Sequence, residues 1–137
     1  MSSWPVKHLS IAIARTPADV YAFAVEPSHL PRWASGLAGG IRQVDGEWRA
    51  DSPMGEVRVA FAPRNDFGVL DHDVTLPNGL TVHNAFRVTP AGDGSVLSFV
   101  VLRLPDVTAQ AFEKDVAHVA SDLRALKTLL QQSQGSP

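Results

Sequence analysis

Cysteine is absent from this chain of 137 residues. Its absence excludes disulfide bonds, thiolate metal sites and cysteine nucleophiles, but it does not fix the compartment in which the protein works. Excess charge is missing too, because twelve basic and fourteen acidic residues give a net charge of -2 without a run of either sign. Nucleic acids and anionic membranes attract proteins through concentrated positive charge. We therefore expect neither of them as a partner.

Long apolar runs are also lacking. No window approaches eighteen apolar residues, and the opening MSSWPVKHLS has no apolar core behind a basic segment. We therefore expect no membrane span and no signal peptide, and we expect a cytoplasmic protein. The five histidines do not have the spacing of metal ligands, and no phosphate-binding loop or Ser-His-Asp order is present. We predict no metal and no cofactor.

The composition is that of one ordinary globular domain, with 45% apolar and 19% charged residues. A chain of this length buries roughly two thirds of its unfolded surface in a single core. We predict one domain over residues 1–137, with frayed ends at 1–3 and 133–137. We expect a monomer or a homodimer.

The chain opens with a strand and two short helices. Residues 8–15 alternate large apolar side chains with polar or small ones, which predicts a half-buried strand. In the next segment, TPADVYAFAV, Thr16 is a natural N-cap and Pro17 suits the first helical position. The stretch EPSHLPRW then carries two prolines four positions apart. Pro27 ends the first helix, and a second short turn runs to about Trp33.

A series of strands follows from residue 41. Asp-Gly separates two extended runs in IRQVDGEWRAD, and PNG at 77–79 separates two others, so both predict hairpins. The alternating or apolar segments predict six strands, at 41–44, 47–51, 56–62, 68–76, 80–88 and 96–104.

The last segment has a helical period. A helix is predicted from Asp106 or Thr108, either of which can cap it, to Gln132. Apolar residues at steps of three and four form one stripe, made of Phe112, Val116, Val119, Leu123, Leu126 and Leu130. Charged residues lie off this stripe, so the helix is amphipathic.

This order of elements predicts an α+β fold. An antiparallel sheet joined by short turns buries one face, and only the final helix is long enough to cover that face. We expect a curved antiparallel sheet of about seven strands, two short helices after the first strand, and a long C-terminal helix packed across the concave face.

Three stretches carry a family likeness. They are the opening strand with TPADVYAFAVEPSHLPRW, the central NDFGVLDHDVTLPNG with FRVTP, and the ending FEKDVAHVASDLRALKTLL. They resemble the SRPBCC superfamily, the START-related helix-grip proteins, which include polyketide cyclases and lipid-transfer domains. The resemblance covers nearly the whole chain. It implies the helix-grip fold, but the superfamily mixes carriers, cyclases, oxygenase domains and chaperone activators.

The DHD sequence at 71–73 is not predicted to bind a metal, because Asp71 and Asp73 point to one side of a strand and His72 to the other. If PNG is a three-residue loop, His72 lies opposite Asn84 on the concave side and Asp73 meets His83 on the solvated side. An inward His and Asn need hydrogen-bond partners. They either satisfy each other or line a cavity and orient a ligand's carbonyl or hydroxyl group.

Three functions stay open at this point. The first is binding of a small apolar or aromatic molecule, lipid-like or polyketide-like, between the sheet and the C-terminal helix. The second, implied by the resemblance, is a cyclase or dehydratase in which His72 moves a proton, although no second catalytic group can be placed beside it. The third is a protein-binding domain like the chaperone activators. That role requires an exposed apolar patch, whereas the outer strand faces are polar.

The residues predicted to contact the ligand are aromatic residues and inward-facing residues of the strands and the last helix. Aromatic residues in a small domain are also common core residues, so a core role for them remains an alternative. The predicted set is Phe23, Trp33, Trp48, Phe61, Leu70, His72, Val74, Val82, Asn84, Phe86, Phe99, Phe112 and Val116.

Overall fold

The computed structural model describes residues 3–132. The fraying predicted for 1–3 and 133–137 therefore lies outside the described residues, apart from Ser3, which belongs to no helix or strand. The elements are β1 (Val6–Ile13), α1 (Pro17–Ala24), η1 (Pro27–His29), α2 (Leu30–Trp33), η2 (Ser35–Leu37), β2 (Ile41–Val44), β3 (Glu47–Ser52), β4 (Gly55–Phe61), β5 (His72–Thr75), β6 (Thr81–Asn84), β7 (Phe86–Ala91), β8 (Gly94–Leu102) and α3 (Ala109–Gln132), where η1 and η2 are 3₁₀ helices.

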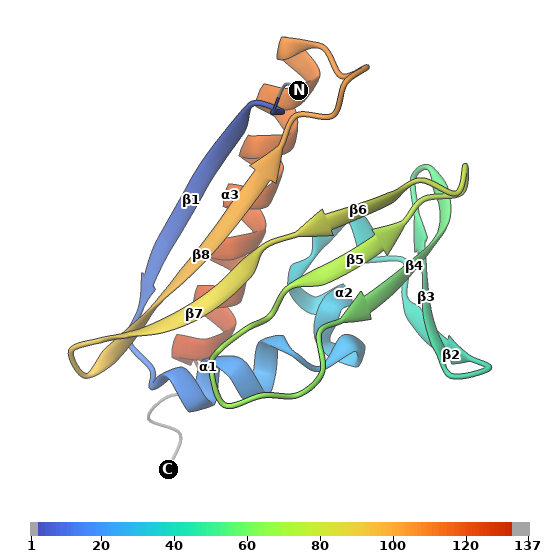
Figure 1. Cartoon of the computed structure of the whole chain (residues 1–137). Coiled ribbons are helices and arrows are strands. Elements are labelled where there is room, and N and C mark those ends of the chain that lie inside the picture. The colour runs from blue at the N-terminus through green and yellow to red at the C-terminus, as the bar shows by residue number, and fades with distance from the viewer. Residues whose placement is uncertain (1–2, 133–137) are drawn as a thin grey trace.

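The predicted α+β helix-grip architecture is confirmed. All strand pairs are antiparallel, and they form a three-stranded sheet in the order β1-β8-β7 and a five-stranded sheet in the order β2-β3-β4-β5-β6. Figure 1 shows α3 running along β1 and β8, while the five-stranded sheet diverges from the helix toward the other side of the molecule. In this view α1 lies at the lower end, and α2 lies above it, nearer the middle of the molecule.

The first helix and the turn after it form for local reasons. The Thr16 hydroxyl accepts a hydrogen bond from the Asp19 N–H at 3.2 Å, and Pro17 occupies the first turn, as predicted. The chain leaves α1 at Val25, and the Glu26 side chain caps η1 by accepting from the Ser28 N–H. The bend directs Trp33 into the core, where its ring lies 5.9 Å from that of Phe86.

One predicted strand is two strands, which is why the structure has eight rather than seven. The segment predicted at 80–88 pairs with β5 as far as Asn84, and from Phe86 onward it pairs with β8. Ala85 lies between the two pairings, and its carbonyl accepts a hydrogen bond from the Val100 N–H at 3.0 Å. The chain changes neighbours at this residue, so the strand ladder breaks there.

The last helix begins at the second of the two predicted caps. The Thr108 hydroxyl accepts from the Ala111 N–H at 3.1 Å. The predicted apolar stripe is confirmed, but its two halves differ in burial. The C-terminal half is buried through Leu123, Leu126 and Leu130, whereas Phe112 and Val116 in the N-terminal half are only half-buried.

Candidate functional site

The inward polar pair predicted from the PNG hairpin is present. His72 lies opposite Asn84 in the β5–β6 register, and Val74 lies opposite Val82. The Leu76 N–H donates to the Leu80 carbonyl, which closes the predicted three-residue loop. The hairpin register could be counted correctly because loop length alone determines which residues face each other.

Both ring nitrogens of His72 have partners. Nδ1 lies 3.0 Å from the Leu70 carbonyl oxygen, and Nε2 lies 3.3 Å from the Asn84 amide nitrogen. A carbonyl accepts only, so Nδ1 carries the proton and Nε2 accepts from the amide N–H₂. Burial lowers the pKa of His72, although the bond to Leu70 and the nearby Asp71 oppose that shift. The ring is therefore neutral near pH 7, and its Nε2 lone pair is already used.

Aromatic rings surround this histidine. Its ring centroid lies 5.0 Å from that of Phe61 and 6.0 Å from those of Phe86 and Phe99. His72 is 8% exposed, whereas Phe61 is half-buried. The inner face of the sheet therefore places a neutral polar group among three phenyl rings.

On the outer face, the predicted Asp73–His83 pair is confirmed, with His83 Nδ1 at 2.7 Å from Asp73 Oδ1. This bond raises the pKa of His83. Asp71 was expected to be an ordinary solvated residue, and that expectation was wrong. It is only 9% exposed, and it accepts from the Phe86 N–H at 2.9 Å and from Arg87 at 3.2 Å.

The physical reason is the strand break at Ala85. Where β6 gives way to β7, the N–H of Phe86 has no strand partner, and the Asp71 carboxylate satisfies it. Partial burial acts to raise the pKa of Asp71, but the hydrogen bonds from Arg87 and Phe86 hold it below the usual range. Asp71 thus joins the two sheets.

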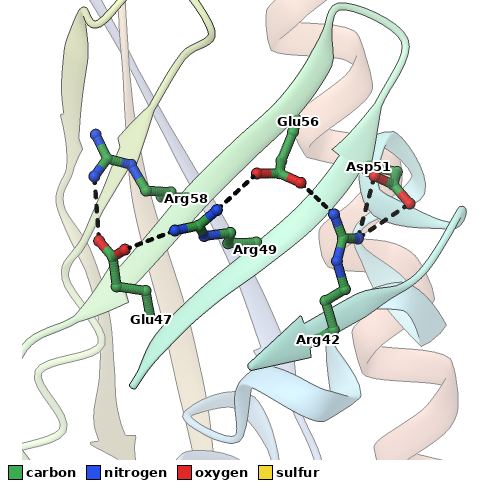
Figure 2. Close-up of polar contacts among 6 residues, drawn as sticks. All are labelled: Arg42, Glu47, Arg49, Asp51, Glu56 and Arg58. Carbon is green, nitrogen blue, oxygen red and sulfur yellow. Dashed lines mark hydrogen bonds and ion pairs between the residues drawn. The ribbon is translucent and has the colours of Figure 1, made fainter. Parts of the chain in front are cut away.

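The rest of the outer face of β2, β3 and β4 carries alternating charges. Figure 2 shows three arginines and three carboxylates in one connected set across these strands. The pairs are Arg42 with Asp51 and Glu56, Arg49 with Glu47 and Glu56, and Arg58 with Glu47. The set has no net charge, and its side chains are largely exposed. Its ion pairs therefore keep this face hydrated and contribute little to the free energy of unfolding.

A cavity of about 500 Å³ lies at the edge of β4. The pairing of β3 with β4 ends at Trp48 and Val59, so β4 continues past the start of β3 without a neighbour on that side. The cavity occupies this place. Its lining consists of Val25, Pro27, Gly46, Glu47, Trp48, Arg58, Val59, Ala60, Phe61, Ala62, Pro63, Arg64, Asp73 and Thr75.

The predicted site residues do not form one lining. Two of them, Trp48 and Phe61, line the cavity, and both are half-buried on the inner face. Five are buried in the core, namely Trp33, Leu70, His72, Phe86 and Phe99. Six are half-buried elsewhere, namely Phe23, Val74, Val82, Asn84, Phe112 and Val116. The lining of this cavity contains no residue of α3.

Sequence reasoning missed the part of the lining that comes from connections. Val25 and Pro27 belong to the bend after α1, and Pro63 and Arg64 follow β4. One signal was present, namely the unequal lengths of the two strands. The pattern of β4 continues to Ala62, whereas β3 begins directly after the Asp-Gly turn and is too short to pair with the end of β4.

A second polar cluster joins η2 to the middle of α3. The Ser35 hydroxyl donates to Asp122 Oδ1 at 2.7 Å and lies 2.8 Å from His118 Nε2. Because its single proton goes to the carboxylate, the hydroxyl accepts from His118, and no base is free to activate it. His118 is half exposed, and its Nε2 also lies 3.7 Å from Asp122 Oδ2. The cluster therefore holds η2 against the helix rather than forming a nucleophilic site.

Within residues 3–132, no group of three or more histidine and carboxylate side chains is placed to hold a metal ion. In the same part of the chain, no helix is long and apolar enough to cross a membrane. The indole N–H of Trp33 is buried and has no hydrogen-bond partner among the described residues.

Comparison with solved structures supports the fold. XoxI from Bacillus cereus superposes with a TM-score of 0.72 at 13% identity, covering 96% of this chain and 99% of that one. A START superfamily protein from Mycobacterium smegmatis gives 0.65 at 14%, covering 94% and 99%. DynU16, a protein in the dynemicin biosynthetic locus, gives 0.70 at 13%, covering 96% of this chain and 48% of that one.

No curated protein matches the sequence. A family model does match, over residues 8–131, which is almost the whole chain, and its description is polyketide cyclase / dehydrase and lipid transport. The match agrees with the helix-grip architecture and with the predicted SRPBCC likeness. The chain belongs to the polyketide cyclase / dehydrase and lipid transport family.

Proposed function

We propose that this protein binds a small apolar or aromatic molecule, lipid-like or polyketide-like, at the free edge of β4 in the five-stranded sheet. The observation that carries the proposal is the cavity of about 500 Å³ in which Trp48 and Phe61 are exposed to a ligand. Pockets of this size are typical of small-molecule sites, and this one combines apolar residues with the charged residues Glu47, Arg58, Arg64 and Asp73. The family description, which includes lipid transport, agrees with such a ligand.

The lining favours a ligand with a flat apolar body and a polar end. Trp48, Val59 and Phe61 provide the apolar wall, and indole and phenyl rings bind planar groups well. Arg58 and Arg64 lie at the same cavity, each already paired with a carboxylate, at 3.1 Å to Glu47 and 3.4 Å to Glu26. A polar group of the ligand could therefore replace a carboxylate as the partner of Arg58 or Arg64.

The N-terminal half of α3 and the β5–β6 hairpin add apolar surface to the candidate site. Phe112 and Val116 on the helix and Val74 and Val82 on the hairpin are half-buried, so a ligand larger than the cavity has apolar surface to occupy. This keeps the predicted location between sheet and helix as part of the proposal.

A catalytic role for His72 is not favoured by its contacts. A general base needs a free lone pair facing the substrate, whereas Nε2 of His72 accepts from Asn84 and the side chain is buried. We propose that the His72–Asn84 pair supports Phe61 and the inner face rather than moving a proton.

The proposal is tested by titrating the folded protein with 8-anilinonaphthalene-1-sulfonate, a planar apolar probe whose fluorescence rises on binding. We expect Trp48→Ala to weaken binding at least about tenfold, because each tenfold corresponds to about 1.4 kcal/mol and a buried aromatic contact provides that much. Trp4→Ala is the matched control, since Trp4 is 45% exposed and lies outside this cavity.

Trp4→Ala should leave the affinity unchanged. Equal affinities for wild type and Trp48→Ala, with both proteins folded by circular dichroism, would remove the cavity from consideration as the site. A screen of fatty acids and aromatic polyketides by native mass spectrometry then names the ligand class.

A further inference from the structure

One residue of β4, Phe61, directs its backbone N–H and C=O groups to the open edge beside the cavity. In an antiparallel ladder, successive residues direct these groups to opposite sides of the strand. The Ala62 N–H donates to the Asp71 carbonyl at 2.8 Å, so Ala62 is directed toward β5 and Phe61 toward the side of β3. On that side the pairing has already ended at Trp48 and Val59. Within residues 3–132, neither backbone group of Phe61 therefore has a hydrogen-bond partner.

The unpaired part of this edge is one residue long. On one side of Phe61, Val59 already pairs with Trp48. On the other side, the next residue with the same direction is Pro63, which has no N–H, and its carbonyl accepts from the Asn65 side chain at 2.9 Å. An added peptide strand gains affinity from several backbone pairs, and residues 59–63 offer one. The edge therefore suits a small molecule that carries one donor and one acceptor.

The donor and the acceptor of such a molecule need a defined spacing. In an antiparallel pair, the unit opposite Phe61 offers its own N–H to the C=O and its own C=O to the N–H. An amino acid with an acylated nitrogen has this arrangement, because its amide nitrogen and its carboxyl group are bonded to one Cα. An ionised fatty acid has acceptors but no donor, and a ketone has the acceptor alone.

We infer that the ligand of this cavity is an N-acylated amino acid. Its amide N–H donates to the Phe61 C=O, and its carboxyl oxygen accepts from the Phe61 N–H. The inference rests on the proposed function, because it names the ligand class for the same cavity.

The cavity walls suit both ends of such a molecule. The Phe61 N–H lies on the side of Arg58 and its C=O on the side of Pro63, so antiparallel pairing directs the carboxyl end toward Arg58 and the acyl end toward Pro63. Val25 and Pro27 line the cavity together with Pro63 and give the acyl chain apolar contacts.

The side chain and the carboxylate of the amino acid also meet suitable residues. Groups opposite each other in a sheet share one face, so the side chain lies on the inner face with Phe61 and Trp48 and is predicted to be apolar or aromatic. At the carboxyl end, Arg58 is paired with Glu47 at 3.1 Å. Glu47 keeps its second partner, Arg49 at 3.2 Å, when Arg58 turns to the ligand.

Isothermal titration calorimetry with two matched ligands tests the inference. N-Dodecanoyl-L-phenylalanine has the amide N–H, whereas its ester analogue, dodecanoylated L-3-phenyllactic acid, has an oxygen in that position. Below the micelle concentration of both, we expect the amide to bind at least about tenfold more tightly, because the ester lacks the donor for the Phe61 C=O. Equal affinities would overturn the inference.

Backbone NMR reports the contact itself. On saturation with N-dodecanoyl-L-phenylalanine, the Phe61 amide proton is expected to move downfield and to exchange more slowly, since it gains an acceptor. The Ala60 amide is the matched control, because it is directed toward β5 opposite Asp73 and should change little. No change at Phe61, or a larger one at Ala60, contradicts the assignment.

Two variants at position 61 separate the N–H from the ring. Phe61→Pro removes the N–H, which belongs to no ladder bond, so proline is tolerated at this edge. Phe61→Ala removes the ring but keeps the N–H, and it is the matched control. We expect Phe61→Pro to bind N-dodecanoyl-L-phenylalanine at least about fivefold more weakly than Phe61→Ala, and both to bind 8-anilinonaphthalene-1-sulfonate alike.

The outcomes distinguish this inference from the proposed function. Equal binding of the acylated amino acid by the two folded variants overturns the inference, and if Phe61→Pro does not fold, the ligand pair and the NMR measurement on wild type decide. Trp48-dependent binding of 8-anilinonaphthalene-1-sulfonate, together with equal affinities for amide and ester, overturns the inference alone. Failure of all three compounds to bind overturns the proposed function as well.

Discussion

Two hairpins follow each other in this chain, and they differ in how completely their inner faces are covered. In the β7–β8 hairpin, Val88, Leu97 and Phe99 face inward and are between 0% and 8% exposed. In the β5–β6 hairpin, Val74 and Val82 occupy the same face and are only half-buried. The difference follows from α3, which packs along β1 and β8 and leaves the five-stranded sheet less covered.

Under the proposed function, the comparison separates stability from ligand binding within one fold. A close-packed hairpin under a helix holds the domain together, because buried apolar area is the largest favourable contribution to folding. The β5–β6 hairpin is half covered on its inner face, and it contributes Asp73 and Thr75 to the cavity lining, so the proposed ligand site lies beside it. Asp71 at the junction, bonded to Phe86 and Arg87, connects the two.

The largest expected effect comes from one substitution made in both hairpins. Leu97→Ala removes a side chain with 0% exposure, and we expect a loss of about 3 kcal/mol in the free energy of unfolding. Leu76→Ala, at the half-buried end of the β5–β6 hairpin, should cost about 1 kcal/mol or less. Urea denaturation measures both. Equal losses would contradict the difference in packing.

The junction gives the next largest effect. Asp71→Ala leaves the Phe86 N–H without its partner, and an unsatisfied buried donor costs about 1–3 kcal/mol. Asp73→Ala is the control, because its pair with His83 is exposed and such pairs contribute about 0–1 kcal/mol. Chemical denaturation of the two variants compares them. A larger loss for Asp73→Ala would show that the junction does not depend on Asp71.

The smallest effect is a dependence on pH with opposite signs for two histidines. Burial lowers the pKa of His72, so its contribution is present above the unfolded value, about 6.5, and is lost as pH falls. The pKa of His83 is raised, so its contribution is present below that value and is lost as pH rises.

We therefore expect His72→Gln to lose less stability than wild type on acidification, and His83→Gln to lose more. Unfolding free energies at about pH 7.5 and about pH 5 measure both slopes, on either side of the unfolded histidine pKa. Slopes that match wild type in both variants would mean that neither ring titrates differently in the folded state.

Features that depend on residues close together in the chain could be predicted from the sequence. The PNG loop determined the pairing of His72 with Asn84, the Thr16 cap placed α1, and the apolar stripe defined α3. Each depends on local chemistry or on one hairpin, so a pattern of a few residues is enough.

Features that depend on which strands become neighbours were not predictable. The break at Ala85 and the burial of Asp71 both arise because β7 pairs with β8 while β6 pairs with β5. The cavity likewise forms where the bend at Pro27 reaches the edge of β4, two segments far apart in sequence. Phe61 was identified from its strand face, and Trp48 only as an aromatic residue after the Asp-Gly turn.

The most direct test of the comparison is hydrogen exchange of the backbone amides, followed by NMR with and without 8-anilinonaphthalene-1-sulfonate. Amides of β8 are expected to exchange only through global unfolding, and those of β5 and β6 through smaller openings. The probe should protect β4 and β5 more than β8. Equal protection in the two hairpins, or a probe effect centred on β8, would contradict the division between a stabilising hairpin and a binding one.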